Sequence, residues 1–261
     1  MRKLKKLLIA VMCMLLAVSP AMTVTVSAGS TTGKSSKGWV ITSDGQRKYR
    51  KNGKFVKGCQ KIGKNYYFFN AKNIMQRKNV SFKGATYYIK NNGCIQGVKK
   101  GSRYMTPNGK KLSSGKISDL RAYQSARRIV NGITAPHMSK AEKLKACYMW
   151  AIRSNGYGGW RKLSDGGNYW YAINANDLFD HRRGDCISYA CAMAYMAKVI
   201  GYNNVNVCSR DTRAGNHHTW TEINGRVYDS YFGKRRGIKK YYGISYNKYD
   251  YKVVFRKRIP S

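Results

Sequence analysis

Residues 184–202 read GDCISYACAMAYMAKVIGY, a long apolar run that opens on Gly-Asp-Cys. The run predicts a buried helix from about Cys186 to Ile200, ended by Gly201. Cys186 would then stand at the helix N-terminus, where unpaired N–H groups and the positive end of the helix dipole lower the pKa of a thiol. The same N–H groups are donors for an oxyanion that forms beside the sulfur. Taken alone, such a cysteine is more often structural than nucleophilic, and we expect Cys191 to lie in the core.

Alternating residues follow this helix and predict strands near 205–209, 218–223, 226–231 and 252–255. Asn224-Gly225 predicts a two-residue hairpin turn. Counting outward from that turn pairs Ile223 with Arg226 and makes Asp229 the diagonal neighbour of His218 on one face, within reach of its imidazole. A slip of one residue would separate them, and the alternative is a surface histidine near an aspartate that caps the next turn.

Two further helices are predicted upstream. Ser139-Lys140-Ala141-Glu142 is a capping box that begins an amphipathic helix, which stops at Asn155-Gly156. An earlier helix is expected from Leu120 to Val130.

Charge and composition limit the class of protein. The 261 residues include 50 Lys and Arg against 11 Asp and Glu, for a net charge of +39, yet 43% are hydrophobic, which excludes a disordered polycation. Basic residues followed by an apolar run (7–18) and Val26-Ser27-Ala28 predict a cleaved secretory signal peptide over residues 1–28, the alternative being an uncleaved anchor. Export permits disulfides among the six remaining cysteines, in a pairing that the sequence leaves open.

The mature chain divides near residue 116. Residues 29–116 carry 21 Lys and Arg and one acid, whereas residues 117–261 carry 25 Lys and Arg, ten acids and all four histidines. Small and polar residues predict linkers over 29–37 and 113–117. We therefore expect a repeat region over 38–112 and a second domain over 118–261.

Short aromatic runs in residues 38–112 alternate with Asn-Gly turns at 52–53, 92–93 and 108–109, which predicts a stacked array of β-hairpins. The pattern resembles the cell-wall-binding repeats of choline- and glucan-binding surface proteins, although Cys59 stands where such repeats usually place Trp. The resemblance and the positive charge favour attachment to an anionic wall polymer or polysaccharide, with a spacer stalk as the alternative. The aromatic residues expected to bind the wall are Trp39, Tyr49, Tyr66, Tyr67, Tyr87, Tyr88 and Tyr104.

Three ordered motifs over residues 118–235 resemble the transglutaminase-like superfamily: Gly184-Asp185-Cys186, His218-Thr219-Trp220 and Val227-Tyr228-Asp229. The resemblance implies a papain-related α+β fold without metal or cofactor. By this analogy Cys186 attacks a carboxamide or peptide carbonyl, His218 moves the proton and Asp229 orients His218. Trp220 is expected to pack beneath the site, or less readily to donate to an oxyanion.

The resemblance leaves the acyl acceptor open: a Lys amine, water or a wall-peptide amine. We therefore expect a secreted, wall-associated thiol acyltransferase, whose partners are protein Gln and Lys side chains or wall peptides. The alternatives are a cysteine peptidase or amidase with the same three residues, and a non-catalytic wall-binding protein. No nucleic-acid-binding motif stands out, and Cys186, Cys191 and the adjacent histidines lack the paired spacing of a zinc site.

Overall fold

The computed structural model describes residues 36–153, 155–159, 161, 167–211 and 218–260. The expected signal peptide, most of the linker over 29–37, and His217 lie outside the described residues. Within these ranges, no helix has both the length and the apolar character that a membrane span requires.

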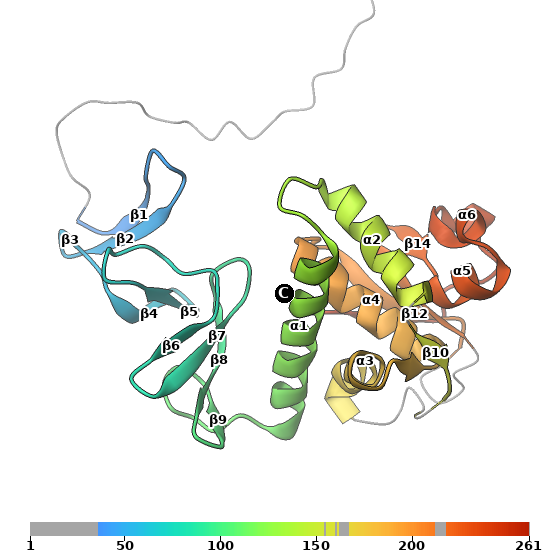
Figure 1. The fold of residues 1–261 in the computed structure, drawn as a ribbon, viewed down its shortest axis with the longest axis horizontal. Coiled ribbons are helices and arrows are strands. Elements are labelled where there is room, and N and C mark those ends of the chain that lie inside the picture. Colours follow the sequence, from blue (N-terminus) through green and yellow to red (C-terminus); the bar gives the residue numbers. More distant parts are fainter. Residues whose placement is uncertain (1–35, 154, 160, 162–166, 212–217, 261) are drawn as a thin grey trace, which may run out of the picture. The chain divides into compact units, whose positions relative to one another are not determined.

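The N-terminal part of the described chain consists of small antiparallel sheets (Figure 1). Their strands are β1 (Gly38–Ile41), β2 (Arg47–Lys51), β3 (Lys54–Phe55), β4 (Gly58–Ile62), β5 (Asn65–Phe69), β6 (Val80–Phe82), β7 (Ala85–Ile89), β8 (Ile95–Lys100) and β9 (Arg103–Met105). Asn52 and Gly53 join β2 to β3 with φ of 50° and 74°, the left-handed values that a two-residue hairpin turn requires. Asn92-Gly93 joins β7 to β8, so two of the expected hairpins are confirmed. Asn108-Gly109 is followed by a single bridge, between Met105 and Lys111.

Aromatic residues hold these hairpins together. Tyr49, Phe69 and Met75 form one buried cluster, and Phe68 packs with Ile89 in another. Because no single hairpin has enough apolar surface to be stable alone, such shared clusters are what stabilise the array.

Helix α1 (Ser114–Ile133) corrects two expectations, because it begins six residues before Leu120 and occupies most of the linker predicted at 113–117. The Ser/Gly-rich stretch is a helix start: the Ser113 side chain accepts a hydrogen bond from the Lys116 N–H and caps the helix. Helix α2 (Lys140–Arg153) begins at the predicted capping box, in which the Glu142 carboxylate accepts from the Ser139 N–H at 2.7 Å.

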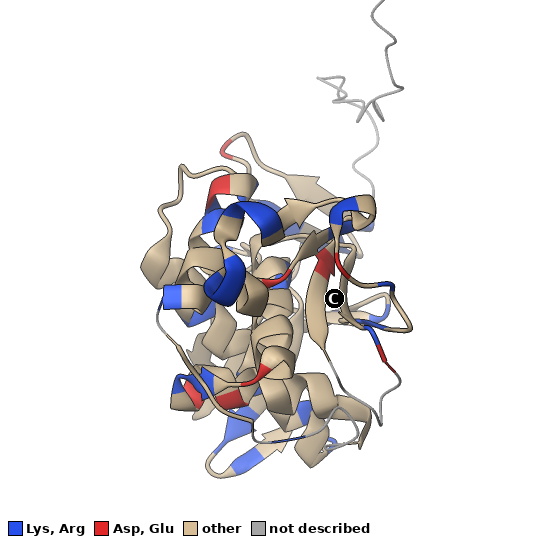
Figure 2. Cartoon of the chain, turned by 90° about the vertical axis from the view of Figure 1, so that its right-hand side faces the viewer, with Lys and Arg blue, Asp and Glu red and all other residues tan. Residues whose placement is uncertain are grey.

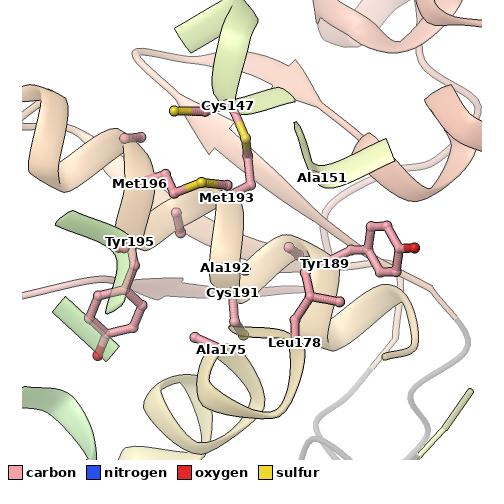
Figure 3. Close-up of a cluster of buried hydrophobic side chains, with 14 of the residues drawn as sticks. Cys147, Ala151, Ala175, Leu178, Tyr189, Cys191, Ala192, Met193, Tyr195 and Met196 are labelled. Atoms are coloured by element: carbon pink, nitrogen blue, oxygen red, sulfur yellow. The ribbon is translucent and has the colours of Figure 1, made fainter. Parts of the chain in front are cut away.

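Helix α4 (Cys186–Ile200) has the predicted bounds, and Gly201 ends it with a φ of 103°. It is buried from Cys186 to Val199, and Figure 3 shows its Met193 and Met196 close to Cys147 of α2. Helix α3 (Trp170–His181), which the sequence did not reveal, packs against α4. The six cysteines of the described residues are all free thiols.

A five-stranded antiparallel sheet completes this part, in the order β15-β14-β13-β12-β16. Its strands are β12 (Val205–Ser209), β13 (Thr219–Ile223), β14 (Arg226–Tyr228), β15 (Tyr242–Ile244) and β16 (Phe255–Arg258). The short elements are β10 (Gly156–Tyr157), parallel to β11 (Arg183–Gly184), the helices α5 (Ser230–Arg236) and α6 (Ile238–Tyr241), and the 3-10 turns η1 (Gly167–Tyr169) and η2 (Tyr246–Lys248). The mixture of helix and sheet agrees with the expected α+β class.

The predicted hairpin register is confirmed at Ile223–Arg226, Glu222–Val227 and Thr221–Tyr228. The strand expected to reach Tyr231 instead ends at Tyr228, because Asp229 caps α5 and turns the chain into a helix. The last strand lies at Phe255–Arg258 rather than 252–255.

Candidate functional site

His218 and Asp229 are hydrogen-bonded, although the ladder that predicted their proximity stops short of them. His218 Nε2 lies 2.6 Å from Asp229 Oδ2, and the two residues are 3% and 1% exposed. Because an ionised carboxylate only accepts hydrogen bonds, Nε2 carries the proton and Nδ1 is left as the proton acceptor of the ring.

The Asp229 carboxylate is held by two more donors. The Phe232 N–H donates to Oδ1 at 2.9 Å, which is the helix cap of α5, and the Tyr249 hydroxyl donates to Oδ2 at 2.8 Å. The Phe232 ring also stacks on the His218 imidazole, with centroids 3.8 Å apart. Asp229 is thus both the cap that the alternative interpretation named and the partner of the imidazole.

Cys186 is the first residue of α4, and Asp185 is the cap, whose carboxylate accepts from the Ser188 N–H at 3.0 Å. Burial first, and then the Asp185 charge, raise the pKa of Cys186 to about 12, although hydrogen bonds from the backbone of Thr219 and Ile187 act in the opposite direction. The lowered pKa expected from the helix N-terminus is therefore wrong for the thiol taken alone, because the desolvation of a thiolate outweighs the helix-end donors.

Cys186 lies against the start of strand β13, the strand that directly follows His218 in the chain. The backbone of Thr219, the residue after His218, bonds the Cys186 sulfur, and the Thr221 hydroxyl donates to the Ala190 carbonyl of α4 at 2.8 Å. The start of α4 therefore lies against the start of β13, and all three of Cys186, His218 and Asp229 are buried.

Residues 127–233 match the family model described as the transglutaminase-like superfamily. This range includes Cys186, His218 and Asp229. A domain of this superfamily is typically a cysteine-based acyltransferase or peptidase.

Other comparisons add little to this match. A comparison with curated proteins gives no match. Among solved structures, the chain is similar to an alternansucrase in complex with isomaltononaose, at 20% identity and a TM-score of 0.23 over 29% of this chain and 6% of that chain. The likeness covers a small part of that structure and carries no argument about fold or function.

Trp220 stacks near the His218 imidazole, with ring centroids 6.2 Å apart, and is 1% exposed. Its indole N–H donates to the Tyr246 hydroxyl at 3.2 Å, and that hydroxyl donates to Glu222 at 2.7 Å. The indole donor therefore has a partner, and the ring packs in a buried cluster that also contains Tyr249.

Several aromatic residues of the site escaped the sequence analysis. Tyr249 contacts Asp229, and the Tyr231 ring lies 6.2 Å from the His218 ring and 4.7 Å from the exposed Tyr157 ring. The signal available for Tyr249 was the density of tyrosines over residues 241–251, which read YYGISYNKYDY.

Two arginine side chains lie against aromatic rings that contact His218, those of Phe232 and Tyr251. The Arg236 guanidinium lies 3.9 Å from the Phe232 ring, and that of Arg210 lies 4.5 Å from the Tyr251 ring. Figure 2 shows that Lys and Arg mark many helices and loops of the described residues on the face in view, and Asp and Glu fewer.

The aromatic residues expected to bind a wall polymer differ in exposure. Trp39 is 41% exposed and makes edge contacts with Tyr49 and Tyr67 at 5.2 and 5.1 Å. Tyr49 is buried, so it serves the core of the hairpins and is not open to a ligand. The others are half-buried, namely Tyr66, Tyr67, Tyr87, Tyr88 and Tyr104.

Proposed function

We propose that this protein is a thiol acyltransferase that acts on carboxamide or peptide bonds, with Cys186 as nucleophile, His218 as general base and acid, and Asp229 as the residue that orients His218. The observation that carries the proposal is the 2.6 Å bond between His218 Nε2 and Asp229 Oδ2, beside a thiol at a helix N-terminus. A cysteine peptidase would use the same three residues, so the acceptor of the acyl group distinguishes the two activities.

The raised pKa of the thiol favours transfer of its proton to a base over independent ionisation. At a pKa of about 12, roughly one thiol in 10⁵ is ionised at pH 7. His218 Nδ1 takes the proton as the sulfur attacks the carbonyl carbon, and Asp229 stabilises the imidazolium that results. The imidazolium then gives the proton to the leaving ammonia or amine, and a thioester remains.

The second half of the reaction reverses the first. His218 removes a proton from an incoming amine or water, which attacks the thioester, and the proton returns to the Cys186 sulfur as it leaves. We assign the oxyanion of both tetrahedral intermediates to the Cys186 N–H at the start of α4, because the Ser188 N–H already donates to the Asp185 cap. An amine acceptor gives a cross-link and water gives deamidation or cleavage.

Intact-mass spectrometry on Gln- and Lys-containing peptides with an added primary amine tests this proposal. Amine incorporation with loss of ammonia supports a transglutaminase, a gain of ~1 Da supports deamidation, and shorter peptides support a peptidase. The control is Cys186→Ala, which we expect to be inactive. Activity that survives in Cys186→Ala would refute the proposal.

We further propose that the protein is secreted and held at the cell wall by its hairpin array. The support is the charge of residues 29–116, with 21 Lys and Arg against one acid, together with the exposed Trp39. The test is sedimentation of the mature chain (residues 29–261) with Gram-positive-type cell walls at physiological salt. We expect Trp39→Ala to weaken binding and Phe82→Ala, which removes a similarly exposed ring, to leave it unchanged; a chain that stays in the supernatant would overturn the proposal.

A further inference from the structure

Tyr249 donates to the same carboxylate oxygen as His218. Its hydroxyl lies 2.8 Å from Asp229 Oδ2, and His218 Nε2 lies 2.6 Å from that oxygen. Burial first, and then the Asp229 charge, raise the pKa of Tyr249 far above its usual value, so the hydroxyl stays protonated and acts as a donor. Oδ2 therefore divides its negative charge between two donors.

Sharing of this kind has two physical consequences. The Phe232 N–H on Oδ1 and the Tyr249 hydroxyl on Oδ2 together fix the rotation of the carboxylate, so that Oδ2 faces the imidazole. The Tyr249 donor also lowers the charge that Oδ2 presents to the Nε2 proton, because hydrogen bonds to one charged group weaken each other.

We propose that Tyr249 is a positioning residue that acts on His218 through Asp229, holding the carboxylate in place and limiting its pull on the Nε2 proton. The inference rests on the proposed function, in which His218 moves the proton. The effect of Tyr249 on His218 passes through one atom, the Asp229 Oδ2 to which both residues donate.

The other groups near His218 leave this route distinct. Among the described residues, Asp229 is the carboxylate bonded to His218, while Tyr231 and Tyr251 lie at ring distances of 6.2 and 5.4 Å. In the described part of the chain, the charged groups near His218 include Arg210 against the Tyr251 ring and Arg236 against the Phe232 ring. Asp250 pairs with Arg236 and Lys240, Glu222 accepts from Tyr246 near Trp220, and Asp185 lies beside Cys186.

The test compares Tyr249→Phe with Tyr246→Phe. Both changes remove a hydroxyl that donates to a buried carboxylate, but Tyr246 donates to Glu222. Proton NMR of ¹⁵N-labelled protein follows the Nε2–H resonance of His218, which lies in a short hydrogen bond. We expect Tyr249→Phe to move this resonance further downfield, since Oδ2 becomes a stronger acceptor, and Tyr246→Phe to leave it in place.

The pH profile of kcat/KM is the second readout. An Asp229 carboxylate that has lost the Tyr249 donor carries more charge toward His218 and favours the imidazolium. We therefore expect the acid limb of the kcat/KM profile to move to higher pH by roughly 0.5–1 pH unit in Tyr249→Phe. Site-specific 3-fluorotyrosine at position 249 makes the phenol a stronger donor and should move both readouts in the opposite direction. This variant keeps the hydroxyl, so it serves if Tyr249→Phe does not fold.

An unchanged resonance and acid limb in folded Tyr249→Phe would overturn the inference, and so would an equal effect of Tyr246→Phe, which would indicate general repacking of the aromatic cluster. The NMR readout does not need turnover. A wild-type protein without activity but with the predicted shift would therefore refute the proposed function while supporting the link from Tyr249 to His218.

Discussion

Asp229→Asn replaces a carboxylate that accepts from three donors with an amide that has one accepting oxygen. If the amide oxygen faces His218 and Tyr249, its NH₂ meets the Phe232 N–H, and the cap of α5 is lost at a cost of about 1–2 kcal/mol. The reverse orientation leaves two donors unpaired, each at about 1–3 kcal/mol. We therefore expect the first orientation, which keeps the proton on Nε2 but removes the charge that stabilises the imidazolium.

The loss of that charge sets the effect on rate. A charge pair about 4 Å apart at an effective dielectric of 20 is worth about 4 kcal/mol, and the amide dipole retains part of it, so kcat should fall on the order of 10²- to 10³-fold. The measurement is the rate of amine incorporation at pH 7, with urea unfolding to follow the loss of about 1–2 kcal/mol of stability. The control is Asp180→Asn, which removes an acid paired with Arg121 at the surface. A kcat for Asp229→Asn within tenfold of wild type would refute this account of the site.

Two further predictions concern the start of α4. We expect Gly184→Ala to destabilise the fold by about 1–3 kcal/mol in urea unfolding, because a Cβ at Gly184 would lie 2.4 Å from the Ser188 Cβ. The control Gly132→Ala, whose Cβ meets nothing within 4 Å, should stabilise the fold by about 0.5–1 kcal/mol, and equal effects of the two variants would contradict the packing argument. Burial raises the pKa of Cys186 to about 12, so the thiol needs a base near pH 7. We expect His218→Ala to abolish alkylation of Cys186 by iodoacetamide near pH 7, and the alkylation rate of this variant to rise toward pH 12, as followed by peptide mass mapping. Alkylation of His218→Ala at pH 7 as fast as in wild type would contradict this prediction.

The sequence predicted the parts of this fold whose local signals agree with their packing. The bounds of α4 follow from Gly184-Asp185-Cys186 at its start and Gly201 at its end. The register of β13 with β14 follows from the Asn224-Gly225 turn. The pairing of His218 with Asp229 was predicted for a partly wrong reason, because the strand ends at Tyr228 and the cap of α5 completes the contact.

Other features depend on distant residues and left no local signal. Tyr249 reaches Asp229 across 20 positions, and the burial that raises the pKa of Cys186 comes from the helices and strands packed around α4. The start of α1 was missed because Ser and Gly serve equally in linkers and in helix caps, and packing decides between the two.

The burial of α4 from Cys186 to Val199 ties the Cys186 thiol to the slowest motions of the domain. Amide protons in such an element exchange with solvent only when the whole cooperative unit opens. The backbone N–H groups beside Cys186 thus stay aligned until that unit unfolds, whereas a nucleophile on a surface loop would lose its alignment by local fraying. Heat inactivation should therefore coincide with global melting.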